Sequence, residues 1–412
     1  MGTVVIVGTM DTKWPEFQFV RACIINSGNN VIVMDVGVMK ESPPEVDIKS
    51  DQVAESGGCT LAEIRFSREG SDTRARALEV MGNGAAVWLK RLLAEKRCDA
   101  VFGMGGSGGT SMLGKTFRTL PLGLPKLIVT TMLAGDVKDV VGTKDITMMY
   151  SVTDIAGLNR VSRTILRNAA NAIAGMAKCR TDVKKVDESN GKPLIALTMF
   201  GVTTKGVQRV RQRLELEGFE TIIFHTTGGG GRAMEEMIEQ GLIDGVVDYT
   251  LAELNGHLIT KMNDAGAGRL TAASRKGIPQ VVVPGALDVC NFPGVENLPA
   301  QFHTKERHLI VHNSMICAVK ASPEELQKLG ETVGEKLTLA AGNTILVYPL
   351  QGIDSYCVKG GPWYQPEDNR ILLKAIKSKI GSVPVDEVDA DINDEEFANI
   401  VSERFIELWR LS

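Results

Sequence analysis

The segment with the clearest chemical potential spans residues 99–112 and reads DAVFGMGGSGGTSM. A strand-like apolar run ends in five glycines among seven residues, and Ser and Thr residues that can open a helix follow. Backbone N–H groups in such a loop can converge on an anion, and the helix N-terminus adds the positive end of its dipole. We therefore expect phosphate contacts from Gly103, Gly105, Gly106, Ser107, Gly108, Gly109 and Thr110. The alternative is a tight strand-to-helix turn that uses glycine for positive φ, although a turn alone needs fewer glycines.

A second polar segment, GTMDTK at residues 8–13, follows the first expected strand. Thr9 and Thr12 can donate hydrogen bonds to a phosphate and Lys13 can neutralise its charge. Asp11 can hold a magnesium ion directly or through water. The segment is not a Walker A loop, because G-x-x-x-x-G-K-[ST] occurs nowhere in the chain. The alternative is a helix N-terminus capped by Asp11 or Thr12, with Lys13 in solvent.

Further polar side chains are expected at the same sheet edge. Asp35 lies near the end of the second expected strand, where Rossmann enzymes keep a carboxylate for the adenosine ribose, about 20 residues beyond the first turn. Small-residue loops after later strands add Thr130, Thr131, Asp136 and Asp154. A strand-end turn would explain Asp35 as well, and ordinary loop capping would explain the others.

The second half contains another glycine cluster, in the segment HTTGGGGRAME at residues 225–235. Successive glycines before an expected helix predict a second anion-binding loop, for a substrate anion or acyl group. The residues concerned are Gly228, Gly229, Gly230 and Gly231, with His225 and Arg232 beside them as candidate catalytic side chains. A structural role for the lone histidine is the alternative.

Residues 285–292, GALDVCNF, place Asp288 and Cys290 after another expected strand. Asp288 is a further candidate catalytic residue. Cys290 could act as a nucleophile, but no sequence feature indicates a lowered thiol pKa, which favours a buried structural cysteine. His308 and His312 have the i, i+4 spacing of a helical metal pair, yet HLIVHN has the composition of a strand, so we expect no metal there.

Alternating strand and helix patterns must position these residues. Apolar runs of strand length alternate with helix-length segments, and residues 71–95 carry apolar side chains at helical spacing. Residues 40–60 are polar and contain proline, which predicts a loop. The last helix is expected from residue 394, capped by Asn393. Strands that alternate with helices predict doubly wound, mainly parallel sheets.

The charged segment RTDVKKVDESNGK at residues 180–192 marks the expected domain boundary. We expect an N-terminal Rossmann-like, nucleotide-binding domain over residues 1–182 and a C-terminal α/β domain with a substrate or partner site over residues 193–412. An interdomain cleft would separate them. Ligands of such sheets bind at the carboxyl ends of the strands, where the motifs above are expected.

Composition limits the class of function. With 412 residues, of which 43% are hydrophobic and 23% charged, the chain resembles a soluble globular protein. A net charge of −4 gives no reason to expect nucleic acid or an anionic membrane as partner. No apolar window reaches the roughly 18 residues of a membrane span, and the strand-like N-terminus argues against a signal peptide. Seven scattered cysteines without a CxxC pair suit a reducing cytoplasm.

Several segments, in fixed order, resemble a known family. GTMDTK, VMDVGV, GMGGSGGT, LPLGLPKLIVTTMLAGDV, DITMMYSVTDIAGLN and NAANAIAGM run through residues 8–176, and TMFGVTT, FHTTGGGGRAMEEMI, GALDVCNF and DINDEEFA follow. Together they are similar to the ATP-binding family of the tomato mosaic virus resistance proteins and their bacterial and fungal relatives. The resemblance implies two Rossmann-like subdomains, ATP with Mg²⁺ in the N-terminal half, and a homodimer. It implies no established reaction.

The resulting hypothesis is a cytoplasmic ATP-binding protein that uses the nucleotide in phosphoryl transfer or in activation of a small acidic metabolite, because positioning and charge neutralisation suffice for such chemistry. One alternative is an NAD(P)-dependent oxidoreductase, suggested by the 103–109 glycines and Asp35. The order of these two features is the reverse of the dinucleotide fingerprint. Another is a non-catalytic regulator whose shape or partner binding depends on nucleotide.

Overall fold

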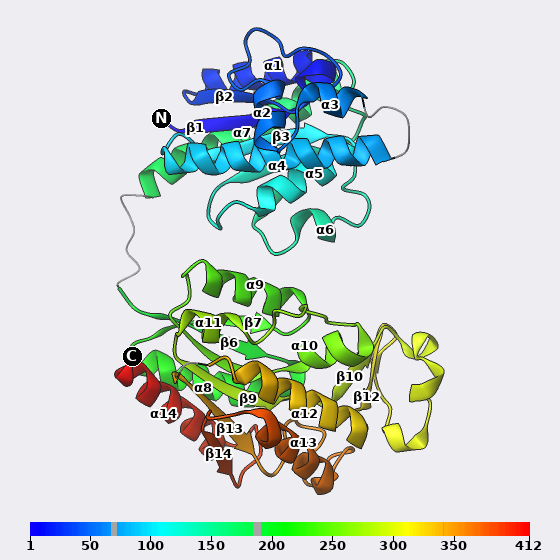
Figure 1. The fold of residues 1–412 in the computed structure, drawn as a ribbon, viewed down its shortest axis with the longest axis vertical. Helices are drawn as coiled ribbons and strands as arrows, with labels where there is room; N and C mark the ends of the chain where they lie inside the picture. The colour runs from blue at the N-terminus through cyan, green and yellow to red at the C-terminus, as the bar shows by residue number, and fades with distance from the viewer. Residues whose placement is uncertain (67–71, 184–190, 341) are drawn as a thin grey trace. The chain divides into compact units, whose positions relative to one another are not determined.

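The computed structural model describes residues 1–66, 72–183, 191–340 and 342–412. The chain divides into two compact units, Met1–Glu188 and Ser189–Ser412, which are described separately below (Figure 1). Residues 184–190, in the middle of the expected connection, lie outside the described residues, as does Ser71, where a helix was expected to start.

The first unit is built on a five-stranded sheet in the order β2-β1-β3-β4-β5. Its strands are β1 (Thr3–Gly8), β2 (Asn30–Asp35), β3 (Ala100–Gly105), β4 (Lys126–Thr130) and β5 (Ile146–Tyr150). Each neighbouring pair is parallel. Every residue of β3 and β4 is buried, as expected for central strands covered on both faces.

Helices cover both faces of this sheet because successive strand residues point in opposite directions. Val4 and Ile6 pack with α1 (Met10–Asn26) and α7 (Arg160–Val183). Val5 and Val7 pack against the other side, with α2 (Ser50–Ser56), α4 (Asp72–Ala94) and α5 (Ser107–Arg118) (Figure 1). The short helices α3 (Leu61–Phe66) and α6 (Lys138–Val141) complete the unit. The prediction of a loop over residues 40–60 is wrong for the part that forms α2, whose Val53 and Ala54 are buried against α4.

The second unit contains a six-stranded parallel sheet in the order β14-β13-β9-β8-β6-β7. Its strands are β6 (Leu194–Met199), β7 (Glu220–His225), β8 (Gly245–Thr250), β9 (Gln280–Gly285), β13 (Thr344–Pro349) and β14 (Val385–Val388). The helices are α8 (Thr204–Leu216), α9 (Gly229–Glu239), α10 (Ala252–Asn255), α11 (Ala272–Lys276), α12 (Pro323–Leu337), α13 (Pro366–Lys379) and α14 (Glu395–Leu411). Two parallel α/β sheets, one in each half, confirm the predicted fold class of two Rossmann-like domains.

An antiparallel three-stranded sheet in the second unit was not expected. It has the order β10-β12-β11, from β10 (Val289–Phe292), β12 (Ile316–Lys320) and β11 (Ile310–Asn313). The expected capping residue of the last helix is also corrected. Asp394 occupies the N-cap position of α14, and Asn393 instead binds the Gly206 amide and the Val202 carbonyl of the neighbouring segment.

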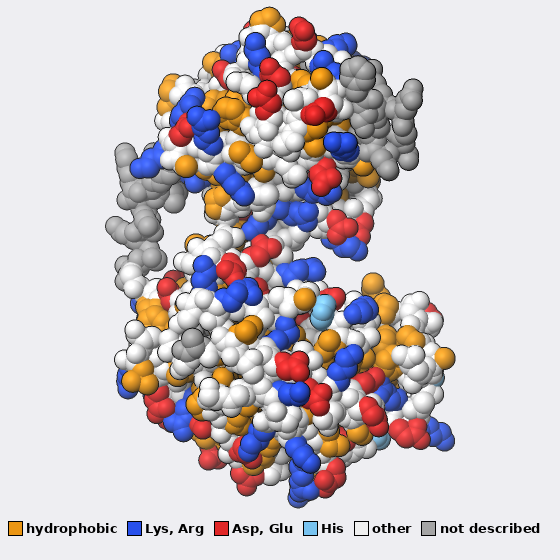
Figure 2. All heavy atoms as spheres, in the orientation of Figure 1, with side chains coloured by type: hydrophobic (Ala, Val, Ile, Leu, Met, Phe, Trp, Pro, Cys, Tyr) orange, Lys and Arg blue, Asp and Glu red, His pale blue; other side chains and the backbone are white. Residues whose placement is uncertain are grey.

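Charged side chains of both signs are interspersed over the visible face of each unit (Figure 2). None of the helices that the structure describes has the length and apolar composition needed to cross a membrane.

Candidate functional site

The strand order of the first sheet makes the chain leave β1 and β3 in opposite directions. From β1 the chain moves outward to β2 and then returns to the other side of β1 as β3. The loops that leave β1 and β3 therefore turn in opposite directions, and a crevice opens between them at the carboxyl ends of the strands. Those loops carry GTMDTK and the 103–109 glycines, so the fold brings together two segments that are far apart in sequence.

A cavity of about 620 Å³ lies at this divergence, wholly within the first unit. Its volume is within the usual range for small-molecule sites. The predicted residues that line it are Thr9, Asp11, Thr12, Lys13, Gly105, Gly106, Ser107, Gly108, Gly109 and Asp154.

The glycines of the β3 loop are not explained by positive φ. None of the glycines in residues 103–109 has a positive φ, so the turn alternative in that form is wrong. They differ in how much space a side chain would have at each position. A Cβ on Gly105 would lie 3.1 Å from the Gly109 Cα, whereas one on Gly106 would meet only the Thr131 Oγ1, at 3.8 Å. Gly106 lines the cavity, and a side chain there would not collide with the protein.

The N-terminus of α5 faces this cavity. Ser107, Gly108 and Gly109 form its first turn, where backbone N–H groups have no acceptor within the helix. No side chain caps this end, and no acidic residue lies in the first turn. The exposed amides and the helix dipole thus present partial positive charge to whatever occupies the cavity. Thr110 does not contribute, because its buried hydroxyl bonds the Gly105 carbonyl and the Thr130 hydroxyl, at 3.2 and 2.7 Å.

The β1 loop supplies the opposite wall. Helix α1 begins at Met10, so Asp11 and Thr12 lie in its first turn and neither caps it. The Asp11 Oδ2 accepts from the Met39 amide at 2.7 Å, while its buried Oδ1 has no partner among the described residues. Lys13 donates to the Ile155 carbonyl. Asp11 therefore lines the cavity and carries one buried carboxylate oxygen without a hydrogen-bond partner among the described residues.

Sequence reasoning missed two arginines that line the cavity, Arg65 of α3 and Arg74 of α4. Arg65 donates to the carbonyls of Val38 and Lys40 and so holds the loop after β2. The Arg74 Nη2 lies 3.3 Å from the place that a Cβ on Gly108 would occupy, directly beside the helix N-terminus. Helical spacing could have identified it, because Arg74 precedes the core-facing Leu78 by four residues.

An apolar wall completes the cavity. It is formed by Val36, Val38, Met39, Ile64, Ala77, Leu78, Met81, Met104, Met112 and Leu113. The cavity lining therefore combines backbone amides and cations with aliphatic and thioether groups. Such a surface suits an amphipathic ligand with an anionic end.

Six residues predicted at this sheet edge do not line the cavity: Gly103, Asp35, Thr110, Thr130, Thr131 and Asp136. Gly103 lies inside β3, where a Cβ would come within 2.7 Å of Leu113. Asp35 is fully buried and accepts from the amides of Met10 and Gly37 and from the Ser42 hydroxyl, at 2.9, 2.8 and 2.7 Å. Burial raises the pKa of Asp35, and these hydrogen bonds oppose the rise. Asp35 therefore organises the loops around β1 and does not present its carboxylate to a ligand.

The second glycine loop is already occupied. The Glu253 Oε1 accepts from the amides of Gly228 and Gly231 at 2.7 and 3.0 Å, at the N-terminus of α9. The Glu253 Oε2 accepts from Arg269, which also binds Asp248 in a fully buried network. Burial would lower the pKa of Arg269, but the surrounding carboxylates raise it well above its ordinary value. The expected site for an external anion at Gly228–Gly231 is therefore corrected: the protein's own carboxylate fills it.

The remaining candidates of the second unit are not assembled into one site. His225 is exposed and packs edge-on against Phe200, with ring centroids 5.6 Å apart, and Arg232 donates to the Asp264 carbonyl. Asp288 is buried in a different loop, after β9. Burial raises the pKa of Cys290 to about 12, which fits a structural thiol and not a nucleophile.

Comparison with known proteins identifies the family. Residues 2–182 match the N-terminal domain model of an uncharacterised protein family, UPF0261, and residues 192–409 match its C-terminal domain model. The chain belongs to the UPF0261 family.

Related proteins align with nearly the whole chain. A UPF0261 protein of Clostridium tetani is 41% identical over 98% of both chains. The ToMV resistance protein Tm-1(GCR237) of Solanum lycopersicum is 34% identical over 98% of this chain and 55% of that protein, which confirms the predicted relationship to the tomato proteins. The Acinetobacter baumannii MurG structure aligns at 12% identity with a TM-score of 0.22, which is too low to carry an argument.

Proposed function

We propose that the N-terminal unit binds a nucleotide, ATP with Mg²⁺, in the cavity between the β1 and β3 loops. The observation that carries the proposal is the uncapped N-terminus of α5, whose amides open into the cavity beside Arg74. These groups fit a phosphate chain, because anions bind readily at helix N-termini and guanidinium groups pair with phosphate.

The other parts of the cavity fit the rest of such a ligand. The apolar wall from Val36 to Met112 suits an adenine ring, which needs little polar contact to be held. The unpartnered Asp11 Oδ1 suits a magnesium ion or its water shell, since Mg²⁺ prefers oxygen ligands. When bound, the ion would neutralise phosphate charge. Arg74 and the α5 amides would orient the phosphates for phosphoryl transfer or metabolite activation.

The alternative of an NAD(P)-dependent oxidoreductase loses its main support, because the Asp35 carboxylate is buried and accepts hydrogen bonds from three donors of the protein. A regulator that binds nucleotide without turnover uses the same cavity and is distinguished by absence of product formation. The homodimer, the cytoplasmic location and the small acidic metabolite stay predictions.

The test compares two glycines that both have room for a side chain. Gly106 lines the cavity and a Cβ there would meet only the Thr131 Oγ1, whereas a Cβ on Gly229 in the second unit would meet nothing within 4 Å. Titration calorimetry with Mg-ATP should show at least about 100-fold weaker binding for Gly106→Val, because each charge-assisted hydrogen bond lost costs about 1.5–3 kcal/mol. Gly229→Val should bind like the wild type.

Circular dichroism and thermal melting establish that both variants are folded. A folded Gly106→Val protein that binds Mg-ATP with wild-type affinity contradicts the proposed phosphate position. A wild-type protein that gives neither heat nor a melting shift with millimolar Mg-ATP contradicts the proposal as a whole.

A further inference from the structure

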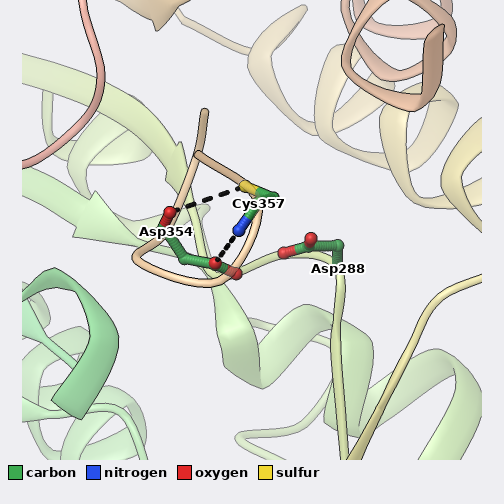
Figure 3. A group of neighbouring side chains, drawn as sticks. All are labelled: Asp288, Asp354 and Cys357. Carbon is green, nitrogen blue, oxygen red and sulfur yellow. Dashed lines mark hydrogen bonds between the residues drawn. The ribbon is translucent and has the colours of Figure 1, made fainter. Parts of the chain in front are cut away.

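Two loops of the second unit bring three ligand-type side chains together in its interior. Asp288 follows β9, and Asp354 and Cys357 follow β13. Strands β9 and β13 are parallel neighbours, so both loops leave the same carboxyl edge of the sheet. Figure 3 shows the Asp288 carboxylate directed toward that of Asp354, with Cys357 on the same turn as Asp354.

The three side chains are close and inaccessible to bulk water. One carboxylate oxygen from each aspartate and the Cys357 Sγ all lie within 4.8 Å of one another. Asp288, Asp354 and Cys357 are 2%, 0% and 4% exposed. This cluster is separate from the cavity of the first unit and from the Glu253–Arg269 network.

Part of the cluster is held by the local backbone. The Asp354 Oδ1 accepts from the amides of Tyr356 and Cys357, at 2.6 and 3.0 Å, and the Cys357 Sγ accepts from the Ile353 amide at 3.1 Å. These contacts close the turn and fix the direction of both side chains. They leave the Asp354 Oδ2 and the Asp288 Oδ1 buried without a hydrogen-bond partner in the described structure.

Two facing buried carboxylates need a positive charge or a shared proton, since an uncompensated buried charge is costly. The neighbouring Lys320 provides only part of that charge, because it lowers the pKa of Asp288 while its Nζ binds Asp368 at 2.5 Å, together with the Trp363 carbonyl and the Gln365 side chain. Burial, the charge of Asp354 and a side-chain hydrogen bond with Asp354 raise the pKa of Asp288 well above its ordinary value, and the charge of Lys320 opposes the rise. The unpartnered oxygens are thus directed at a place where a cation would satisfy both.

We propose that Asp288, Asp354 and Cys357 bind a divalent transition-metal cation, with zinc as the best fit to one sulfur and two oxygen ligands. Ligand atoms around a tetrahedral zinc are roughly 3.5 Å apart, so any of the three ligand atoms that lie farther apart must move closer together when the metal binds. Three protein ligands leave a fourth position, which water fills in zinc sites of this kind. On binding, the Cys357 thiol proton and the proton that the two carboxyl groups share are both released to solvent, so affinity rises with pH.

The test uses the full-length protein and the metal alone. After removal of metal with a chelator and incubation with Zn²⁺, the wild type should retain about one zinc per chain by mass spectrometry of the metal. Co²⁺ in place of zinc should give a thiolate-to-cobalt absorption band. Asp288→Asn and Cys357→Ser should retain less than about a tenth of the zinc, and the cobalt band should disappear in Cys357→Ser.

Cys290→Ser is the matched control, because Cys290 is an equally buried thiol of the same unit outside the cluster. It should keep both the zinc and the cobalt band. A wild type that holds no metal and shows no cobalt band overturns the proposal. A proton shared between the two carboxyl groups is then the explanation of their close approach. Zinc retention that is unchanged in Asp288→Asn or Cys357→Ser overturns it too. The wild-type cobalt spectrum decides the matter even if a variant does not fold.

Discussion

The two glycine loops of this chain look alike in sequence and differ in what their amides face. Both follow a parallel strand and both open a helix, α5 in the first unit and α9 in the second. At α5 the amides open into a cavity of about 620 Å³ that two arginines also line. At α9 the amides of Gly228 and Gly231 bind the carboxylate of Glu253.

This difference separates a binding loop from a structural one. Gly231 must lack a side chain because a Cβ there would lie 1.8 Å from the Glu253 carboxylate. Gly230 must lack one because its Cβ would lie 2.0 Å from the His225 carbonyl oxygen. Gly106 has no such neighbour. Glycine in the second loop thus makes room for the protein itself, whereas at Gly106 it leaves room for something else. The density of glycines does not distinguish the two cases.

The largest expected effect comes from removing the internal anion. Glu253→Ala leaves the Arg269 Nε and two glycine amides buried without partners. We expect the second unit to lose about 3–5 kcal/mol of unfolding free energy, the usual cost of breaking a buried ion pair. Denaturant unfolding measures the loss, and nucleotide binding by the folded first unit should not change.

Gly229→Ala is the control for this variant, because a Cβ there meets nothing within 4 Å. Its unfolding free energy should stay within about 0.5 kcal/mol of the wild type. If Glu253→Ala were as stable as Gly229→Ala, the internal-anion account of the second loop would be wrong.

The next effect concerns the arginine beside the first loop. Arg74→Ala should weaken Mg-ATP binding by about 1.5–3 kcal/mol, the value of one hydrogen bond to a charged group. Arg76→Ala is the matched control, since Arg76 lies two residues further along α4 and does not line the cavity. Titration calorimetry compares the two variants. Equal affinities would remove Arg74 from the proposed phosphate site.

The sequence was sufficient for the two parallel sheets and for the cavity loops that follow β1 and β3. Buried runs such as 100–105 identify central parallel strands, and the carboxyl ends of those strands are where ligands bind. The occupant of the second loop could not be predicted, because Glu253 and Arg269 lie more than 20 residues beyond the glycines that they organise. Local spacing carries no signal for a partner that only the tertiary fold brings close.

Asp35 shows the same limit in the first unit. Its position at the end of β2 is the one expected for a ribose-binding carboxylate. The donors that use it come from Met10, Gly37 and Ser42, on either side of it in the sequence, and only the fold directs all three at one carboxylate. Position along a strand therefore predicted where Asp35 would lie but not what it would contact.

The smallest effect tests this structural role of Asp35. Asp35→Asn keeps an oxygen that can accept from the two amides and should leave Mg-ATP affinity within about threefold of the wild type, a difference below about 0.7 kcal/mol. If a folded Asp35→Asn protein lost nucleotide binding, the structural account would be wrong and a contact between Asp35 and the ribose would explain the loss.

The same variant should also change how stability depends on pH. Burial raises the pKa of Asp35 above its ordinary value of 3.8, so the folded state holds this proton more tightly than the unfolded chain does. The stability that the proton contributes is complete below 3.8 and is lost as pH rises through the raised pKa. Asparagine has no such proton. The unfolding free energy of the wild type relative to Asp35→Asn should therefore fall as the pH rises above 3.8 and through the raised pKa. Urea unfolding at several pH values measures this difference, and one that stays constant or increases would show that hydrogen bonds to the ionised carboxylate outweigh its burial.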